Sequence, residues 1–303
     1  MKIILTLLIG VVMLSPGAHA QQKSREVAKG DDDWAFDVRW KDGNGKSRRV
    51  EFELPTRAIK DDLAVPLQFQ MRDANAQVVK AINAYGKKLK GVELKAQAAG
   101  NGIRISGRGS RKKLKKAAAG AKDVQKKALR KYMKKNGFTK LKGKIIPNHA
   151  QHAYRYADDV EPLAKALGSE KLGRRQFAAK ALAFVQTIPY EKGKGGRDKG
   201  FRPPLSLLAK NKGDCDSKAT LYLALLKSAH PSLDSSFIYI NGHAFVGLGL
   251  KPKSGDMTFQ ADGRKWVIAE PVGPALISLG DADKQSKRKA RRGKIGIRRV
   301  KDD

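Results

Sequence analysis

The chain has 303 residues, of which 63 are Lys or Arg and 29 are Asp or Glu, so its formal net charge is +34. A charge of this size indicates anionic partners or surfaces, but it does not indicate a fold. Hydrophobic residues make up 41% of the chain, enough for the core of one or two domains, which argues against a wholly disordered protein. The only cysteine is Cys215, which excludes an internal disulfide.

The first twenty residues have the pattern of a secretory signal peptide. Lys2 precedes an apolar run from residue 3 to residue 14, and the small-residue end Ala18-His19-Ala20 follows. The run is shorter than the roughly 20 residues that cross a bilayer, and no later segment comes close. We therefore expect cleavage after Ala20, a mature chain without a transmembrane segment, and a periplasmic or secreted location.

Residues 21 to 33 are polar and predict a flexible leader. Residues 34 to 107 predict a small α/β module, to which we assign no function. The module begins with a β-hairpin, because apolar and polar residues alternate on both sides of the turn-rich segment 42–45. A helix over 74–85 and a strand over 102–106 complete it. The alternating apolar residues are Trp34, Phe36, Val38 and Trp40 before the turn and Val50, Phe52 and Leu54 after it.

Residues 108 to 144 predict a basic helical segment. Apolar residues recur at helical spacing from residue 110 to residue 136, and Gly137 is the expected stop. Between Arg111 and Lys144 there are fifteen Lys or Arg and one acid, Asp123. Two interpretations of this charge are open: a solvated helix face, or a surface that docks on an anionic partner.

The composition and apolar pattern of residues 145 to 280 are typical of a globular domain. The apolar pattern predicts helices over 148–167 and 174–188. Residues 281 to 303 form a basic tail, which we expect to be poorly ordered because ten Lys or Arg fall between Lys284 and Lys301. One short strand containing Ile295, Ile297 and Val300 is the alternative there. The strands expected in the domain lie at 237–240, 243–250, 257–261 and 265–269.

An exported protein with a single cysteine either buries an inert thiol or keeps it for chemistry. Cys215 follows Asp214, a good helix N-cap, and the residues after it predict a helix, so the thiol lies in the first turn. Backbone N–H groups and the helix dipole there favour the thiolate, although Asp214 and Asp216 oppose this effect. The base that takes the thiol proton is expected to be His243, which opens a strand, with Glu270 at the end of another strand to orient its ring.

Three motifs in this region stand in the order of a known family. They are GDCDSKA at residues 213–219, GHAFV at 242–246 and WVIAEP at 266–271. Together they resemble the bacterial transglutaminase-like superfamily, over about residues 145 to 272. The resemblance implies a papain-like core, in which a helix bearing the cysteine packs on an antiparallel sheet. It also implies acyl transfer through a thioester, which ends in hydrolysis or in transfer to an amine.

The resemblance assigns the catalytic roles to Cys215, His243 and Glu270. The family usually has Asp at the third position, and Glu270 gives the carboxylate a longer reach. Asp262 is the fallback, although an aspartate in a hairpin turn commonly serves the turn itself. The backbone N–H of Cys215 is expected to help hold the oxyanion. The sequence does not identify the second donor, for which Tyr190 is one candidate.

No organic cofactor is implied by the resemblance. His149 and His152 stand three apart on a predicted helix, but no Cys or further His lies near them to complete a metal site. Asp214 and Asp216 stand where some periplasmic proteases resembling this family bind calcium, yet two carboxylates are too few for the about 6–8 oxygens that Ca²⁺ takes. The loop at 193–200 lacks the residue order of a phosphate-binding loop. We therefore expect no nucleotide and no resident metal, and Ca²⁺ at Asp214 and Asp216 is the alternative that stays open.

These observations lead us to expect an α+β protein that acts as an exported cysteine hydrolase or acyltransferase on an amide or isopeptide bond of a protein or peptide. Hydrolysis is favoured because water is always present, whereas transfer requires a site for an amine. The rival interpretation is a non-catalytic basic protein that binds anionic cell-envelope polymers, and the intact Cys, His and acid argue against it. The export signal argues against nucleic acid as a partner in vivo, although so basic a protein would bind DNA in vitro.

Overall fold

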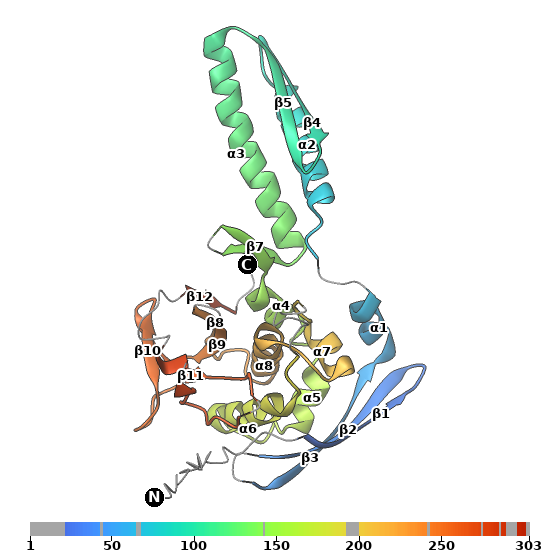
Figure 1. Cartoon of the computed structure of the whole chain (residues 1–303), viewed down its shortest axis with the longest axis vertical. Helices are drawn as coiled ribbons and strands as arrows, with labels where there is room; N and C mark the ends of the chain where they lie inside the picture. Colours follow the sequence, from blue (N-terminus) through green and yellow to red (C-terminus); the bar gives the residue numbers. More distant parts are fainter. Residues whose placement is uncertain are drawn as a thin grey trace, which may run out of the picture.

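The computed structural model describes residues 22–42, 45–64, 68–141, 143–191, 200–240, 243–273, 275–284, 286–288 and 296–300. The predicted signal peptide, most of the Gly- and Lys-rich loop and Gly242 of the second motif lie outside these residues. The described chain is a mixed α+β structure whose sheets are antiparallel (Figure 1). The predicted α+β class is therefore confirmed.

A five-stranded antiparallel sheet forms the centre of the larger body, with strand order β10-β11-β9-β8-β12. Its inner strands are buried on both faces. In β8, Phe237 and Tyr239 pack into the main core with α8, whereas Ile238 and Ile240 pack on the opposite face with Phe245. The four predicted strands and the predicted helix are thus confirmed. Their bounds are β8 (Ser235–Ile240), β9 (His243–Leu248), β10 (Thr258–Ala261), β11 (Arg264–Ala269), β12 (Gly296–Arg299) and α8 (Cys215–Ala229).

The helix expected over residues 148 to 167 is two helices, α4 and α5, separated by a turn. Pro162 lies in the first turn of α5, where its missing N–H leaves no intrahelical hydrogen bond unmade. The second predicted helix is confirmed as α6, and these helices pack with α7 around α8. Their bounds are α4 (His149–Arg155), α5 (Glu161–Ala166), α6 (Arg174–Thr187) and α7 (Pro204–Lys210).

The predicted flexible leader is wrong, because its residues form strand β1, which pairs antiparallel with β2. Strands β2 and β3 form the predicted hairpin, with Phe36 opposite Phe52. The apolar face of this sheet joins the main core, where Trp40 meets Phe184 of α6 edge-on at 5.3 Å. The sheet is therefore part of the larger body. The bounds are β1 (Gln22–Lys29), β2 (Asp33–Lys41), β3 (Ser47–Pro55) and the following helix α1 (Thr56–Ala64).

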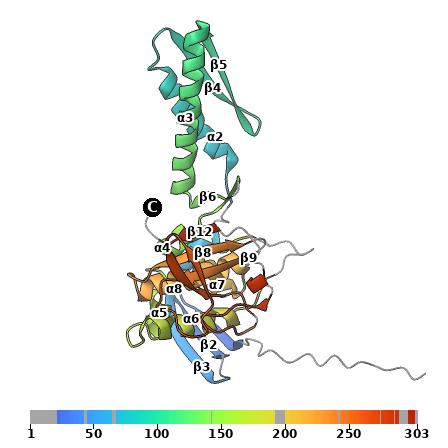
Figure 2. The same ribbon diagram turned by 90° about the vertical axis from the view of Figure 1, so that its left-hand side faces the viewer.

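The second half of the predicted N-terminal module belongs to a different unit. Helices α2 and α3 and the hairpin β4–β5 form an elongated arm that projects from the larger body (Figures 1 and 2). The arm has its own small core, in which Val78 and Ile82 of α2 pack with Leu94 and Ala121. The predicted division at residue 107 is wrong, because α3 supplies one wall of this core. The bounds are α2 (Met71–Gly86), β4 (Val92–Ala99), β5 (Gly102–Gly109) and α3 (Arg111–Lys135).

A short hairpin, β6 (Phe138–Leu141) and β7 (Lys144–Pro147), returns the chain from the arm to the larger body. The expectation of a poorly ordered tail is wrong for its described residues. Strand β12 is an edge strand of the central sheet, with Ile297 opposite Ile238 of β8, and Val300 packs against the main core. Within the described ranges, no helix is both long enough and apolar enough to cross a membrane.

Candidate active site

The start of α8 is held by a side-chain cap. Oδ1 of Asp214 accepts hydrogen bonds from the backbone N of Ser217 at 2.8 Å and from its hydroxyl at 2.6 Å. Cys215 is the first residue of the helix and is half-buried. The N–H groups of a first turn lack intrahelical acceptors, and their partial positive charge favours a thiolate. The sequence therefore placed Cys215 correctly at a helix N-terminus.

The segment before Cys215 is fixed by backbone and side-chain hydrogen bonds. Tyr190 forms a parallel β-bridge with Gly213, and the backbone N of Glu191 donates to the carbonyl of Gly213 at 3.0 Å. Arg202 donates two hydrogen bonds to Glu191, at 2.9 and 2.7 Å, and its backbone N donates to the Ser217 hydroxyl at 2.8 Å. The backbone of Tyr190, the candidate second oxyanion donor, therefore lies beside the residues that lead into α8.

His243 and Glu270 meet at the ends of adjacent strands. His243 opens β9 and Glu270 directly follows β11, and the two strands pair with Val246 opposite Ala269. Nε2 of His243 lies 2.6 Å from Oε1 of Glu270, and the two side chains are 15% and 3% exposed. A carboxylate only accepts hydrogen bonds, so Nε2 carries the proton and Nδ1 remains for a thiol. The structure thus brings this predicted pair together.

Two residues of the C-terminal segment hold the Glu270 carboxylate. The Ser286 hydroxyl lies within hydrogen-bond distance of Oε1, at 2.8 Å, and of a carboxylate oxygen of Asp283, and the backbone N of Asp283 donates to Oε2 at 2.9 Å. Asp283 in turn accepts a hydrogen bond from the backbone N of Ser286 at 3.0 Å. These bonds fix the direction of the carboxylate toward His243. The sequence analysis missed Ser286 and Asp283, because a serine and an aspartate in a basic segment form no recognisable motif.

Lys218 links α8, the helix that begins at Cys215, to the chain segment that carries Glu270. Its Nζ donates hydrogen bonds to the carbonyl of Val272, two residues after Glu270, and to the carbonyl of Ile188 at 2.7 Å. Lys218 is fully buried, and burial lowers the pKa of its ammonium to about 7. Residues three apart lie on one face of a helix, so α8 contacts the segment after Glu270 one turn from Cys215.

Comparison of the chain with protein-family models, with curated proteins and with solved structures found no match. Any function assigned to the contact between His243 and Glu270 therefore rests on the sequence and structure of this chain. The transglutaminase-like assignment stays a prediction, which rests on the order of the three motifs. The positions of Cys215, His243 and Glu270 at the ends of α8, β9 and β11 are compatible with it.

Asp216 lies between the thiol and a buried histidine. Its Oδ1 is 3.6 Å from Sγ of Cys215, and its Oδ2 is 3.7 Å from Nε2 of His149. Nδ1 of His149 lies 2.9 Å from the hydroxyl of Tyr239. Burial lowers the pKa of His149 to about 3, so its ring is neutral at pH 7 and does not offset the charge of Asp216. Asp216 therefore opposes thiolate formation, as the sequence predicts.

The residues considered for a metal have protein partners. His152 places Nε2 2.9 Å from the carbonyl of Gly137, and burial lowers its pKa to about 4. Asp214, considered for calcium, caps α8. In the part of the chain that the structure describes, one group of three possible metal ligands has its donor atoms within 4.8 Å of one another. The group comprises His243, Glu270 and Asp283. Hydrogen bonds within the protein already account for the geometry of this group.

Asp262, the fallback acid, stands away from this site. Asp262 and Gly263 have φ angles of 50° and 73° in the turn between β10 and β11. The Asp262 carboxylate lies 3.5 Å from Nε of Arg299. The whole of β11 separates this turn from Glu270, a distance of about 20 Å at roughly 3.3 Å per residue. The structure therefore favours Glu270 as the partner of His243.

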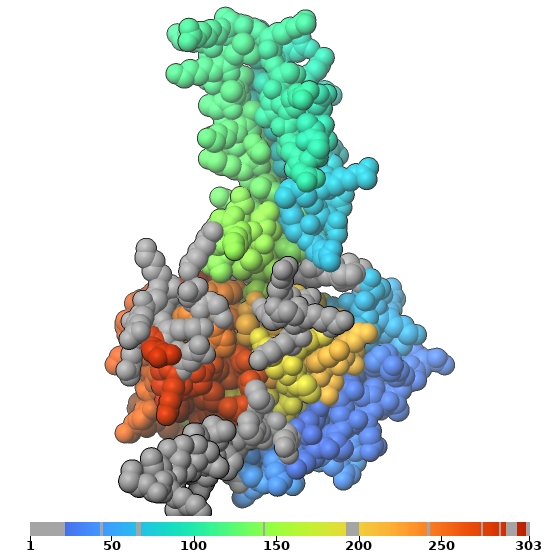
Figure 3. All heavy atoms as spheres, in the orientation of Figure 1, coloured from blue at the N-terminus to red at the C-terminus, as the bar shows by residue number. Residues whose placement is uncertain are grey.

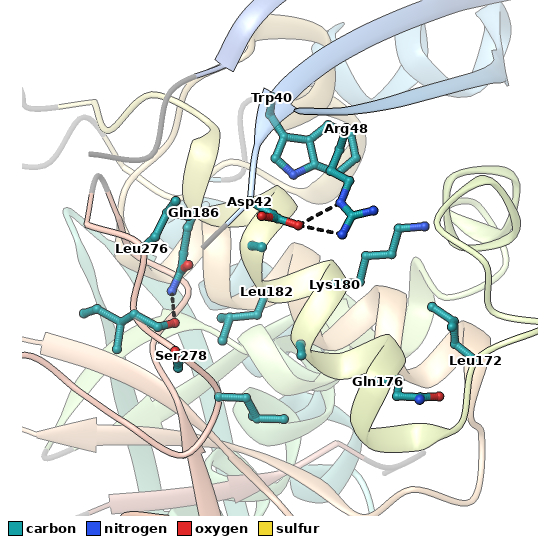
Figure 4. A pocket seen from close by; sticks show the side chains of 14 residues that line it. Trp40, Asp42, Arg48, Leu172, Gln176, Lys180, Leu182, Gln186, Leu276 and Ser278 are labelled. Carbon is teal, nitrogen blue, oxygen red and sulfur yellow. Dashed lines mark hydrogen bonds and ion pairs between the residues drawn. The ribbon is translucent and has the colours of Figure 1, made fainter. Parts of the chain in front are cut away.

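A cavity of about 440 Å³ lies between the β2–β3 hairpin, α6 and the segment that follows Glu270 (Figure 4). None of the three candidate catalytic residues lines it. Two hydrogen bonds join polar groups of its wall: Arg48 donates to Asp42 at 2.7 Å, and Gln186 donates to the carbonyl of Ile277 at 2.9 Å. Gln186 also donates to the carbonyl of Glu270 at 2.9 Å. One side chain is therefore shared by the cavity wall and by the segment that carries the candidate acid.

Proposed function

We propose that this chain is an exported transglutaminase-like cysteine enzyme that cleaves an amide or isopeptide bond of a protein or peptide through a thioester on Cys215. The observation that carries the proposal is the 2.6 Å contact between His243 and Glu270. An imidazole held by a buried carboxylate has its tautomer and direction fixed, as a general base requires. The position of Cys215 in the first turn of α8 supports the same function.

The proposed reaction begins when Nδ1 of His243 takes the proton of the Cys215 thiol. The thiolate attacks the carbonyl carbon of the substrate, and the backbone N–H of Cys215 helps to stabilise the oxyanion. His243 then protonates the leaving amine as the C–N bond breaks, which leaves an acyl group on sulfur. Water, deprotonated by His243, attacks this thioester and releases the acid and the free thiol.

Hydrolysis is proposed over transfer to an amine, because transfer requires a bound amine to outcompete water for the thioester. Glu270 stabilises the imidazolium that forms in both halves of the reaction, since its charge lies next to Nε2. Neither half of the proposed reaction calls for an organic cofactor.

A partner is proposed for the arm, residues 71–135. The arm carries twenty Lys or Arg against three Asp or Glu, and its surface stands clear of the larger body (Figure 3). Twelve of these bases are exposed on α3. The large apolar side chains exposed there are those of Met71 and Ile105, which offer little area for insertion into lipid. We propose that the arm holds the enzyme on an anionic polymer of the cell envelope.

The test of the enzymatic proposal is the reactivity of the thiol in the folded protein. We expect iodoacetamide to alkylate Cys215 faster than a free thiol at pH 7, because the helix N-terminus and His243 favour the thiolate. His243→Ala should slow the reaction. A thiol-reactive acyl probe should form an adduct on the wild-type protein, and mass spectrometry should place it on Cys215.

Alkylation that occurs only after denaturation would show a core cysteine and would contradict the proposal. An alkylation rate equal in wild type and His243→Ala would also contradict it. In either case the rival function, a non-catalytic binding protein built around the arm, would be favoured.

A further inference from the structure

Lys218 is a buried basic residue. Among the bonds that the structure describes, none joins its Nζ to a carboxylate. Its Nζ donates three hydrogen bonds to backbone carbonyls, those of Gln186 at 3.2 Å, Ile188 at 2.7 Å and Val272. An ammonium has three donors, so these bonds use all of them. The Lys218 side chain is 0% exposed, so its ammonium has no water to donate to and relies on these carbonyls for its hydrogen bonds.

The three carbonyls belong to two chain segments that meet at this point. Gln186 and Ile188 close α6, and Val272 follows Glu270 by two residues. The segments approach closely, because a Cβ built on Gly273 would lie 2.2 Å from the Gln186 carbonyl oxygen, and Gly273 has a φ of 60°. The ammonium therefore stands where α6, α8 and the acid-bearing segment join.

We propose that Lys218 is a positioning residue, which sets the distance between the nucleophile on α8 and the His243–Glu270 pair. The inference rests on the proposed function and names what holds its site together. Lys218 follows Cys215 by three residues on one face of α8. Val272 follows Glu270 by two residues, and Glu270 contacts His243. A single ammonium thus ties both halves of the catalytic arrangement to the end of α6.

The chemistry of a buried lysine supports this role over simple packing. Desolvation opposes a buried charge and lowers the pKa of Lys218, whereas the three carbonyl oxygens around Nζ favour the charged form. A Met or Leu at the same place would fill the space without that cost, so a residue needed only for packing has no reason to be Lys. An ammonium with three directed bonds, in contrast, holds three backbone atoms at once.

The test compares the pH dependence of Cys215 alkylation by iodoacetamide in the full mature chain. Lys218→Met should lower the rate at pH 7 at least about tenfold and raise the midpoint of the pH profile by about one unit, toward the value of an ordinary thiol. Lys227→Met is the matched control, because Lys227 also lies on α8 and also donates to a carbonyl, that of Pro231, at its far end. The control should keep the wild-type midpoint.

A second variant covers the case in which Lys218→Met does not fold. Gly273→Ala adds a methyl group against the Gln186 carbonyl and should push the acid-bearing segment away, with a smaller shift of the midpoint in the same direction. Each variant is also melted, because a purely structural lysine would lower the melting temperature and leave the midpoint of folded protein unchanged.

A folded Lys218→Met with the wild-type rate and midpoint would overturn the inference and leave the proposed function intact. If Lys218→Met does not fold, an unchanged midpoint in Gly273→Ala has the same meaning. A wild-type profile that His243→Ala does not alter would overturn the proposed function, and the positioning role would fail with it.

Discussion

Nε2 of His243 lies 2.6 Å from Oε1 of Glu270, although 27 residues separate the two in the chain. Glu270→Gln keeps the shape of this side chain and removes its charge, so the imidazolium that forms during catalysis loses its counterion. We expect the alkylation rate of Cys215 at pH 7 to fall by roughly 10²-fold, within the range typical of general base catalysis, with little change in melting temperature. Asp262→Asn, at the β10–β11 turn, should leave the rate unchanged. The reverse pattern would refute the assignment of Glu270.

The hydroxyl of Ser286 lies within hydrogen-bond distance of the same carboxylate oxygen, at 2.8 Å. Ser286→Ala leaves Glu270 in contact with His243 but removes one bond that fixes its direction. Loss of such a supporting bond typically costs about tenfold, and we expect a fall of that size in the alkylation rate. Single-turnover acylation by an activated ester measures the same effect independently. A rate equal to wild type in both assays would show that Ser286 has no part in orienting the acid.

The basic C-terminal segment is predicted to be necessary for the fold. Deleting residues 284 to 303 removes Ser286 and the edge strand β12, which pairs with β8 over four residues. We expect the truncated chain to lose thiol reactivity and to melt at a lower temperature. Circular dichroism melting and alkylation kinetics measure the two losses. A truncated protein that retains both properties would show that this segment is a dispensable tether.

We predict that the positive charge of the arm determines how tightly the protein binds anionic polymer and does not affect the candidate active site. Replacing the four basic residues from Lys126 to Lys131 by Gln should weaken binding of the mature protein to immobilised anionic polymer and flatten its dependence on salt. Screening explains the salt dependence, since the Debye length falls from about 10 Å at 0.1 M to about 3 Å at 1 M salt. The control replaces the exposed Lys251 and Lys253 of the larger body. Equal retention of both variants would contradict a role for the arm.

Stability should fall in mild acid because of His149. Burial lowers its folded pKa to about 3, below the ordinary value of 6.5, so the unfolded chain binds a proton that the folded chain excludes. Its contribution is therefore fully present above pH 6.5 and is lost as the pH falls toward 3. At about 1.4 kcal/mol per pH unit, lowering the pH from 6.5 to 5.0 costs about 2 kcal/mol.

Urea unfolding at pH 7.5 and at pH 5.0 measures this loss. His149→Gln retains a polar group near Tyr239 but has no titratable ring, so its unfolding free energy should fall less between the two pH values than that of wild type. The difference between the proteins isolates His149 from the carboxylates that titrate in the same range. An equal fall in both would show that His149 does not carry the effect.

Local patterns predicted the strands of the central sheet and the start of α8, because those signals lie within a few residues of each element. Short apolar runs predicted the strands, Asp214 predicted the start of α8, and the end of a predicted strand placed Glu270. The contact of His243 with Glu270 requires β9 and β11 to be neighbours. The papain-like core implied by the resemblance places the histidine and the acid on adjacent strands. The assignment of the three residues to catalysis remains a prediction, because the geometry alone does not test it.

The division of the chain into units could not be predicted, because it depends on which apolar faces meet. The β2–β3 hairpin and α2 each have one apolar face, yet the hairpin packs into the main core whereas α2 packs on α3. The C-terminal segment was misjudged for a related reason. Its Lys and Arg side chains suggested solvent on all sides, but the backbone of an edge strand pairs whatever its outward side chains are.

The Glu270 carboxylate is oriented by residues that leave the ribosome after every candidate catalytic residue. A nascent chain that has exposed Cys215, His243 and Glu270 still lacks Ser286, which contacts that carboxylate, and β12, which closes the edge of the sheet. The thiol is therefore made before the arrangement that would activate it. The contact of His243 with Glu270 is therefore expected to reach its final geometry only when the C-terminal residues are available for folding.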